Sequence, residues 1–294
     1  MSRSLRLPGP WVLFLSGALA VVVPVYTFAQ DAAPAIAPAP AAATLTPEAM
    51  EVFLQKARIV SRRDTGSGVT NSVRATLSDG TLTHDAQIQT IDVSQTSFQA
   101  GKATELNFKD SYRYNIAGYK MARLLGMDNV PMSVERRVES KTAAMTWWID
   151  DVKMTEKERL SKGTAGPRPL RTTEQLLLMR VFDELIQNKD RNQGNILWTG
   201  DWKMWLIDHT RAFRTGKELV NAASMTRCDR LMLQQLRALT RQQVDEAMTG
   251  TLTKAEIDAL MARRDLIVKH FDERIAKLGE AVVLYDLDPP VIRL

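Results

Sequence analysis

The sequence has little of what two common kinds of protein site require. It contains a single cysteine, Cys228, so it can form neither an intrachain disulfide nor a cysteine-based zinc site. No two of its three histidines lie four residues apart, which excludes the HExxH motif of zinc proteases. It also has no GxSxG nucleophile motif and no Walker A phosphate loop. Function must therefore be sought in other residue patterns.

The overall composition is that of an ordinary globular protein. Of the 294 residues, 45% are hydrophobic and 25% are charged, which suits one or two folded domains. The formal net charge is +5, and removing residues 1–29 takes away two arginines and no acid, which leaves +3. Because this basicity is mild, we expect no nucleic-acid partner.

Residues 1–29 have the features of a secretory signal. Arg3 and Arg6 form a positive start, the stretch 11–23 is uncharged, and small residues at 27 and 29 suit a cleavage point. We therefore expect an extracytoplasmic protein, periplasmic or secreted. An uncleaved membrane anchor is the alternative, and it would be the protein's only contact with a membrane.

An Ala/Pro-rich linker over residues 30–46 separates this segment from the rest of the chain. The remainder is predicted to be an α+β fold with two lobes. Residues 47–150 form a small β-containing lobe, residues 151–171 a mobile loop, and residues 172–294 a mostly helical lobe.

Local signals place the elements of the first lobe. Thr46 and Pro47 begin a helix whose apolar side continues to Val60. A loop with Gly66 and Gly68 precedes a β-hairpin that turns at residues 78–80. A helix is predicted over residues 110–125, and short strands over 130–134 and 143–149 follow it.

Capping boxes mark the helices of the second lobe. Thr172 with Gln175 predicts a helix start, and the same pattern recurs at Thr240 with Gln243 and at Thr253 with Glu256. The last of these predicts a helix from 254 to about 278.

The chemically informative segments flank a predicted hairpin. Strands over 196–199 and 203–207 enclose a tight turn, and counting outward pairs Trp198 with Met204 and Ile196 with Leu206. Asn195 and Asp208 then lie at the open ends of strands whose backbones are about 5 Å apart.

These positions suit a metal-dependent phosphoryl transfer. The oxygens of Asn195 and Asp208 can share one hard cation such as Mg²⁺, which also keeps several waters. Asp190 follows the buried helix and lies five residues before Asn195. It can therefore accept the proton of an attacking hydroxyl while the amide and the second carboxylate hold the metal on the phosphates.

The residues 190–195 (DRNQGN) and 207–209 (IDH) together resemble the catalytic loop and the metal-binding Asp of the phosphatidylinositol-kinase-like branch of the kinase fold. The similarity is greatest to the atypical kinases of the secretory pathway and to the bacterial HipA-type kinases, and it spans about 66–215. Residues 110–131 are similar to their first-lobe helix and following strand, and residues 147–151 to their adenine-contacting hinge.

This resemblance implies ATP and Mg²⁺ or Mn²⁺ as cofactors. It also implies a role for each matching residue: a catalytic base at Asp190, metal ligands at Asn195 and Asp208, and cofactor contacts at Gly66, Gly68, Gln89, Asn115 and Trp148.

Two of these positions depart from the family pattern. Gln89 stands where the family has a nucleotide-binding lysine, and Asn115 stands where it has the glutamate that pairs with that lysine. Losing the lysine alone would leave a buried acid unpaired, so the joint change is physically coherent. The missing positive charge has four candidate sources: Arg74, Lys102, Lys109 and Arg113.

Residues beside the expected site have simpler interpretations. We expect Arg191 to be a structural arginine of its loop that pairs with an acid, with a substrate contact as the alternative, and we expect His209 to pack or to form hydrogen bonds. The downstream arginines are interpreted as a solvated face, with an anionic substrate as the alternative: Arg211, Arg214, Arg227 and Arg230.

Three functions remain open from the sequence. The first is an exported atypical kinase that phosphorylates a hydroxyl group of a protein, sugar or small molecule. The second is a pseudokinase or binding module of the same fold, which the Gln89 and Asn115 departures favour. The third is a nucleotidyl transferase that binds the nucleotide in reverse and transfers AMP.

Overall fold

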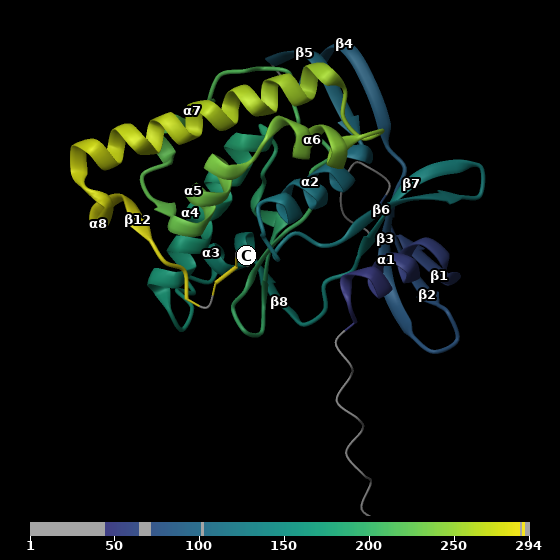
Figure 1. The fold of residues 1–294 in the computed structure, drawn as a ribbon. Helices are drawn as coiled ribbons and strands as arrows, with labels where there is room; N and C mark the ends of the chain where they lie inside the picture. Colours follow the sequence, from purple (N-terminus) through teal and green to yellow (C-terminus); the bar gives the residue numbers. More distant parts are fainter. Residues whose placement is uncertain (1–44, 65–71, 101–102, 289, 292–294) are drawn as a thin grey trace, which may run out of the picture. The chain divides into compact units, whose positions relative to one another are not determined.

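The computed structural model describes residues 45–64, 72–100, 103–288 and 290–291 (Figure 1). The predictions for the signal segment, most of the linker, Gly66, Gly68 and Lys102 fall outside these residues. No helix of the described ranges is long and apolar enough to cross a membrane.

A five-stranded antiparallel sheet organises the first lobe, in the spatial order β1-β2-β3-β7-β6. The strands are β1 (Arg58–Asp64), β2 (Val73–Ser78), β3 (Thr83–Gln89), β6 (Ser133–Val138) and β7 (Lys141–Trp147). Helix α1 (Pro47–Lys56) packs on one face through Phe53 and Leu54, which join a core with Leu77 and Met145. Helix α2 (Arg113–Leu124) contacts β6 and β7.

Strand β3 shows how the sheet divides its side chains. Ala86 and Ile88 point into the core shared with α1. Successive residues of a strand point to opposite faces, so Asp85, Gln87 and Gln89 lie on the other face. That face carries the polar groups of the candidate site described below.

The second lobe is mostly helical. Its helices are α3 (Glu156–Ser161), α4 (Pro169–Ile186), α5 (Arg230–Ala238), α6 (Arg241–Met248), α7 (Lys254–Leu278) and α8 (Glu280–Val283). A three-stranded sheet holds β8 (Val152–Thr155), β9 (Ile196–Thr199) and β10 (Met204–Leu206), and a parallel pair joins β11 (Cys228–Asp229) to β12 (Leu284–Tyr285). Its core includes the fully buried Phe182, Trp198 and Phe271. The predicted α+β fold with a β-containing lobe and a helical lobe is confirmed.

Several local predictions for the second lobe are confirmed. The hairpin pairs Trp198 with Met204 and Ile196 with Leu206. The capping boxes at Thr240 and Thr253 both form, and the latter begins α7, which ends at Leu278.

The prediction of a mobile loop over 151–171 is wrong for its first part. Residues 152–161 form β8 and α3, and Thr155 with Glu158 makes a capping box. The charged composition was misleading because Glu156 is buried, where it accepts hydrogen bonds from Arg159 and from Trp198 Nε1 at 2.8 Å.

Other element boundaries also differ from expectation. The first helix ends at Lys56, because the residues from Arg58 onward pair with β2. Helix α4 begins at Pro169 rather than at Thr172. Gln175 does not cap it, because its side chain donates to Trp202 O at 3.0 Å and accepts from Met204 N at 2.8 Å.

A second hairpin, which the sequence did not predict, lies between β3 and α2. Its strands are β4 (Asp92–Ala100) and β5 (Ala103–Ser111), so Asp110 belongs to a strand and not to the helix predicted over 110–125. Lys109 Nζ and Tyr114 Oη both donate to Glu256 Oε1 at 2.6 Å. Glu256 therefore joins β5, α2 and α7 at one buried point.

Glu256 generates a prediction about pH. Burial by itself raises the pKa of this carboxyl, but the hydrogen bonds from Lys109 and Tyr114 outweigh it and hold the pKa below its usual range. The carboxylate therefore stabilises the fold at neutral pH, and this contribution is lost as the pH falls below about 4. Glu256→Gln should lower the free energy of unfolding at pH 7 and reduce its loss between pH 5 and 3, as measured by urea denaturation.

Glu273→Gln is the matched control, because Glu273 lies on the same helix with a side chain that is 69% exposed. It should leave the pH dependence unchanged. An identical pH profile for the wild type and the Glu256 variant would contradict the prediction.

Candidate functional site

The loop after α4 carries the predicted catalytic base. Gln187 ends the helix in the left-handed conformation, with φ of 49°, and the chain then turns through Asp190 to a short 3-10 helix, Gln193–Asn195. Asn192 caps this turn by accepting from Gly194 N at 2.8 Å. The Asp190 side chain stands at the loop surface and is about half exposed.

Arg191 is the residue that fixes this loop. Its side chain is only 7% exposed and pairs with Asp183 of α4 at 3.0 Å. Its Nη1 also donates to the carbonyls of Asn195 at 3.3 Å and Ile207 at 2.6 Å. The expectation that Arg191 pairs with an acid is confirmed, and one guanidinium connects α4, the loop and the strand that leads to Asp208.

The hairpin brings the two predicted metal ligands to neighbouring backbones. Ile207 N donates to Asn195 O at 3.1 Å, so Asp208 directly follows the residue that is hydrogen-bonded to Asn195. Asp208 has a φ of 54°, a conformation that is uncommon for residues other than glycine. Its Oδ1 accepts from the Thr210 hydroxyl at 3.0 Å, which holds the carboxylate in a local turn.

An arginine contacts the predicted base. Arg211 Nη1 lies 3.0 Å from Asp190 Oδ2, and its guanidinium lies 5.0 Å from the ring centre of Phe108 on β5. Arg214 lies 5.7 Å from the same ring. The other two downstream arginines point elsewhere, since Arg227 pairs with Glu174 and Arg230 with Glu280.

Asp110 is a candidate site residue that the sequence analysis did not identify. It is buried on β5, and its Oδ1 has no hydrogen-bond partner in the described part of the chain. Burial raises the pKa of Asp110, and the negative charges of Asp208 and Asp190 act in the same direction. Its position just before α2 could have identified it, but the sequence pattern predicts a helix that includes residue 110.

The two positions that depart from the family pattern meet in the structure. Asn115 Nδ2 donates to Gln89 Oε1 at 2.5 Å, and Asn115 Oδ1 accepts from His209 N at 2.7 Å. Both side chains are buried. A neutral chain of hydrogen bonds thus runs from β3 through α2 to the segment that follows Asp208.

His209 packs against α2 at a glycine. A Cβ atom on Gly118 would lie 2.9 Å from His209 Cγ, so the ring fits only because residue 118 has no side chain. The ring also meets the edge of Phe182 at a centroid distance of 6.0 Å. Burial holds the pKa of His209 well below its usual range, so the ring is neutral. These contacts support the packing role expected for it.

Trp148 follows β7, and its ring is covered by a cation. The Arg74 guanidinium lies 4.1 Å from the ring centre and pairs with Asp85 at 2.5 Å. The other described candidates for the missing lysine charge also have acidic partners. Lys109 pairs with Glu256, and Arg113 lies 3.5 Å from Asp92.

The oxygen-bearing side chains of the candidate site fit a divalent cation only in part. Among the described residues, no group of three or more His, Cys, Asp or Glu side chains is already arranged to hold a metal. The candidate set instead combines the Asp208 carboxylate, the Asn195 amide and the buried Oδ1 of Asp110, which lacks a partner. Oxygen donors of this kind, completed by water, fit Mg²⁺ or Mn²⁺.

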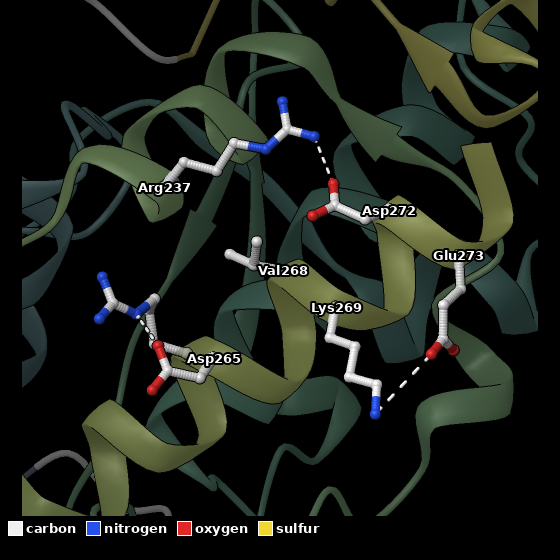
Figure 2. A pocket seen from close by; sticks show the side chains of 7 residues that line it. Arg237, Asp265, Val268, Lys269, Asp272 and Glu273 are labelled. Atoms are coloured by element: carbon white, nitrogen blue, oxygen red, sulfur yellow. Dashed lines mark hydrogen bonds and ion pairs between the residues drawn. The ribbon is translucent and has the colours of Figure 1, made fainter. Parts of the chain in front are cut away.

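A separate surface pocket of about 430 Å³ lies along α7 (Figure 2). Its charged side chains pair with one another, as Arg237 does with Asp272 and Lys269 with Glu273 at 3.8 Å. It includes none of the predicted site residues.

Comparison with known proteins identifies the fold. Neither a protein-family model nor a curated protein matches the sequence. The solved structure of hydra Fam20 with a sugar has a TM-score of 0.62 at 14% identity and covers 81% of this chain and 92% of its own. The Golgi casein kinase with Mn and ADP bound has a TM-score of 0.61 at 14% identity, over 81% and 79%. The chain therefore has an atypical kinase-like fold, as predicted.

Arg191 generates a stability prediction. Arg191→Lys should lower the free energy of unfolding by about 3 kcal/mol, because an ammonium group cannot reproduce the planar fork that reaches Asp183 and two carbonyls. Urea denaturation measures the change. Arg230→Lys is the control, since its ion pairs are partly exposed, are screened by solvent and should contribute much less. Equal losses in the two variants would contradict the role assigned to Arg191.

Proposed function

We propose that this protein is an exported kinase-like phosphotransferase that uses ATP and a divalent metal to phosphorylate a hydroxyl acceptor. The observation that carries the proposal is the Arg191 guanidinium, which bonds the carbonyls of Asn195 and Ile207 beside the loop that holds Asp190. The candidate base and both candidate metal ligands are thereby attached to one rigid point. The kinase-like fold supports the same activity.

Each site residue has one role in this proposal. Asp208 and Asn195 would hold Mg²⁺ or Mn²⁺, which would supply positive charge to neutralise the phosphates. The oxygen of the acceptor hydroxyl forms a bond to the γ-phosphorus of ATP, and the bond from that phosphorus to ADP breaks. Asp190 accepts the proton that the hydroxyl gives up. Since Asp190 pairs with Arg211 at 3.0 Å, that pair must loosen before the carboxylate can act.

The location and the acceptor follow from other features. The signal-like residues 1–29 support a periplasmic or secreted protein, attached to a membrane only if this segment is retained. The acceptor is a protein, a sugar or another small molecule that carries a hydroxyl group, and we propose no nucleic-acid partner.

A second candidate function is a binding module with weak or no catalysis. The neutral hydrogen bond between Gln89 and Asn115 favours it, because it replaces a positive charge that would contact the phosphates. Nucleotidyl transfer is the remaining alternative. Mass spectrometry of the products distinguishes the two transfers, since an acceptor gains either a phosphate or an AMP group.

Metal-dependent nucleotide binding tests the site directly. ATP with Mn²⁺ at 100 times the dissociation constant should stabilise the wild type by about 2.7 kcal/mol, measured as a thermal shift. Asp208→Ala should lose this shift because it removes the charged metal ligand. Asp190→Asn should keep the shift and lose turnover.

An Asp208→Ala protein that keeps both the shift and turnover would refute the site assignment. A wild type that shows the shift without turnover would favour the binding module.

The pair on β3 and α2 gives a further prediction. Asn115→Glu alone should lower the melting temperature, because it buries an acid beside a neutral partner. Adding Gln89→Lys should recover much of the loss and tighten ATP binding. Gln87→Lys is the control, because Gln87 lies on the same face of β3 but bonds Ser72 instead. Equal recovery by both lysines would show that the 89–115 contact is not specific.

A further inference from the structure

Asp110 poses a specific physical problem. The residue is 8% exposed and its Oδ1 has no hydrogen-bond partner among the described residues. It sits in the β4–β5 ladder opposite Val93, so its backbone is held in place. Buried polar atoms in folded proteins nearly always have partners, and an exception requires an explanation such as an ion or water.

The neighbours of Asp110 place it beside the candidate metal ligand. The Thr210 hydroxyl donates to Asp208 Oδ1 at 3.0 Å, and its side chain also lies close enough to Asp110 to lower the pKa of that carboxyl. Ser111 N donates to Thr210 O at 2.9 Å, which holds the two segments together. A hydroxyl has one proton, so it can satisfy only one of two ionised carboxylates.

The charges around this hydroxyl do not balance. Asp110 and Asp208 both lie close to Thr210, and the Arg211 guanidinium, which pairs with Asp190, also acts on Asp110, so one cation faces three carboxylates. A hard divalent cation suits this arrangement of carboxylates, because it takes carboxylate oxygens from more than one segment and completes its shell with water. Asn195 offers a neutral oxygen donor next to the strand that leads to Asp208.

We propose that Asp110 is a further ligand of the divalent-metal site, contributed by β5 of the first lobe. This inference rests on the proposed function, which assigns Asp208 and Asn195 to the same ion. The metal would take the unpartnered Oδ1 of Asp110, while Thr210 keeps its proton for Asp208. Binding would then connect the β4–β5 hairpin to the segment that follows β10.

The competing explanation is a protonated Asp110. A neutral carboxyl could donate to Thr210 and would make the residue a structural acid without any affinity for metal. The two explanations differ in what an amide does at this position. Asparagine keeps the shape and can donate a hydrogen bond, but it lacks the charge that a cation needs.

The test uses Mn²⁺ alone, titrated into the full-length protein and followed by electron paramagnetic resonance, with Mg²⁺ as competitor. Asp110→Asn should weaken Mn²⁺ binding at least tenfold, and Asp208→Ala should abolish it. Asp92→Asn is the matched control, because Asp92 lies on the same hairpin and pairs with Arg113. It should bind Mn²⁺ within twofold of the wild type.

The outcomes separate this inference from the proposed function. If Asp208→Ala loses Mn²⁺ while Asp110→Asn keeps wild-type affinity, Asp110 is no ligand and the proposed function stands. If Asp208→Ala binds as the wild type does, the site of the proposed function fails as well. A wild type that binds no Mn²⁺ without nucleotide also overturns the inference, because the three donors would not form a site of their own.

Thermal melting supplies a readout independent of affinity. Without metal, Asp110→Asn should melt no lower than the wild type, because the substitution removes one of the two neighbouring carboxylates that compete for the Thr210 proton. With saturating Mn²⁺ the Asp110→Asn variant should melt at a lower temperature than the wild type, because it binds the ion more weakly. A variant that melts lower under both conditions would identify Asp110 as a structural acid.

Discussion

The candidate site depends on one buried guanidinium. Arg191 reaches Asp183 on α4 and the carbonyls of Asn195 and Ile207, so it aligns three segments that the chain presents separately. Arg263 likewise donates to backbone carbonyls of two separate segments. It is fully buried on α7 and donates to Leu185 O at 2.9 Å and Arg214 O at 3.0 Å. The helix before the candidate catalytic loop and the segment after Asp208 are therefore held by the same kind of bond.

Near the site, polar contacts join the two lobes in addition to the apolar packing of α2 on the core of the second lobe. Asn115 links β3 to His209, Glu256 links β5 and α2 to α7, and the hydrogen bond from Ser111 N to Thr210 O links β5 to the segment after Asp208. A buried hydrogen bond is directional and is costly to leave unmade, so each contact specifies one relative placement of its segments. This is a physical reason for the precision that a metal and nucleotide site would require.

The second lobe was the more predictable part of the fold. The β9–β10 register and two capping boxes were correct, because a short turn and a local side-chain bond determine each of them. The errors occurred where a distant partner decided the structure. The 151–171 segment looked like a charged loop until Trp198 and Arg159 satisfied Glu156. The β4–β5 hairpin and Asp110 were missed because their anchors lie on α7 and beyond β10.

The sequence by itself determined the spacing of Asp190, Asn195 and Asp208, because a tight hairpin brings the last two to neighbouring strands whatever surrounds them. It also indicated that positions 89 and 115 change together. Only the tertiary structure decided that Arg211 pairs with Asp190 and that Asp110 lies beside Thr210. Contacts between residues so far apart in the chain depend on the packing of both lobes, and no local pattern encodes that packing.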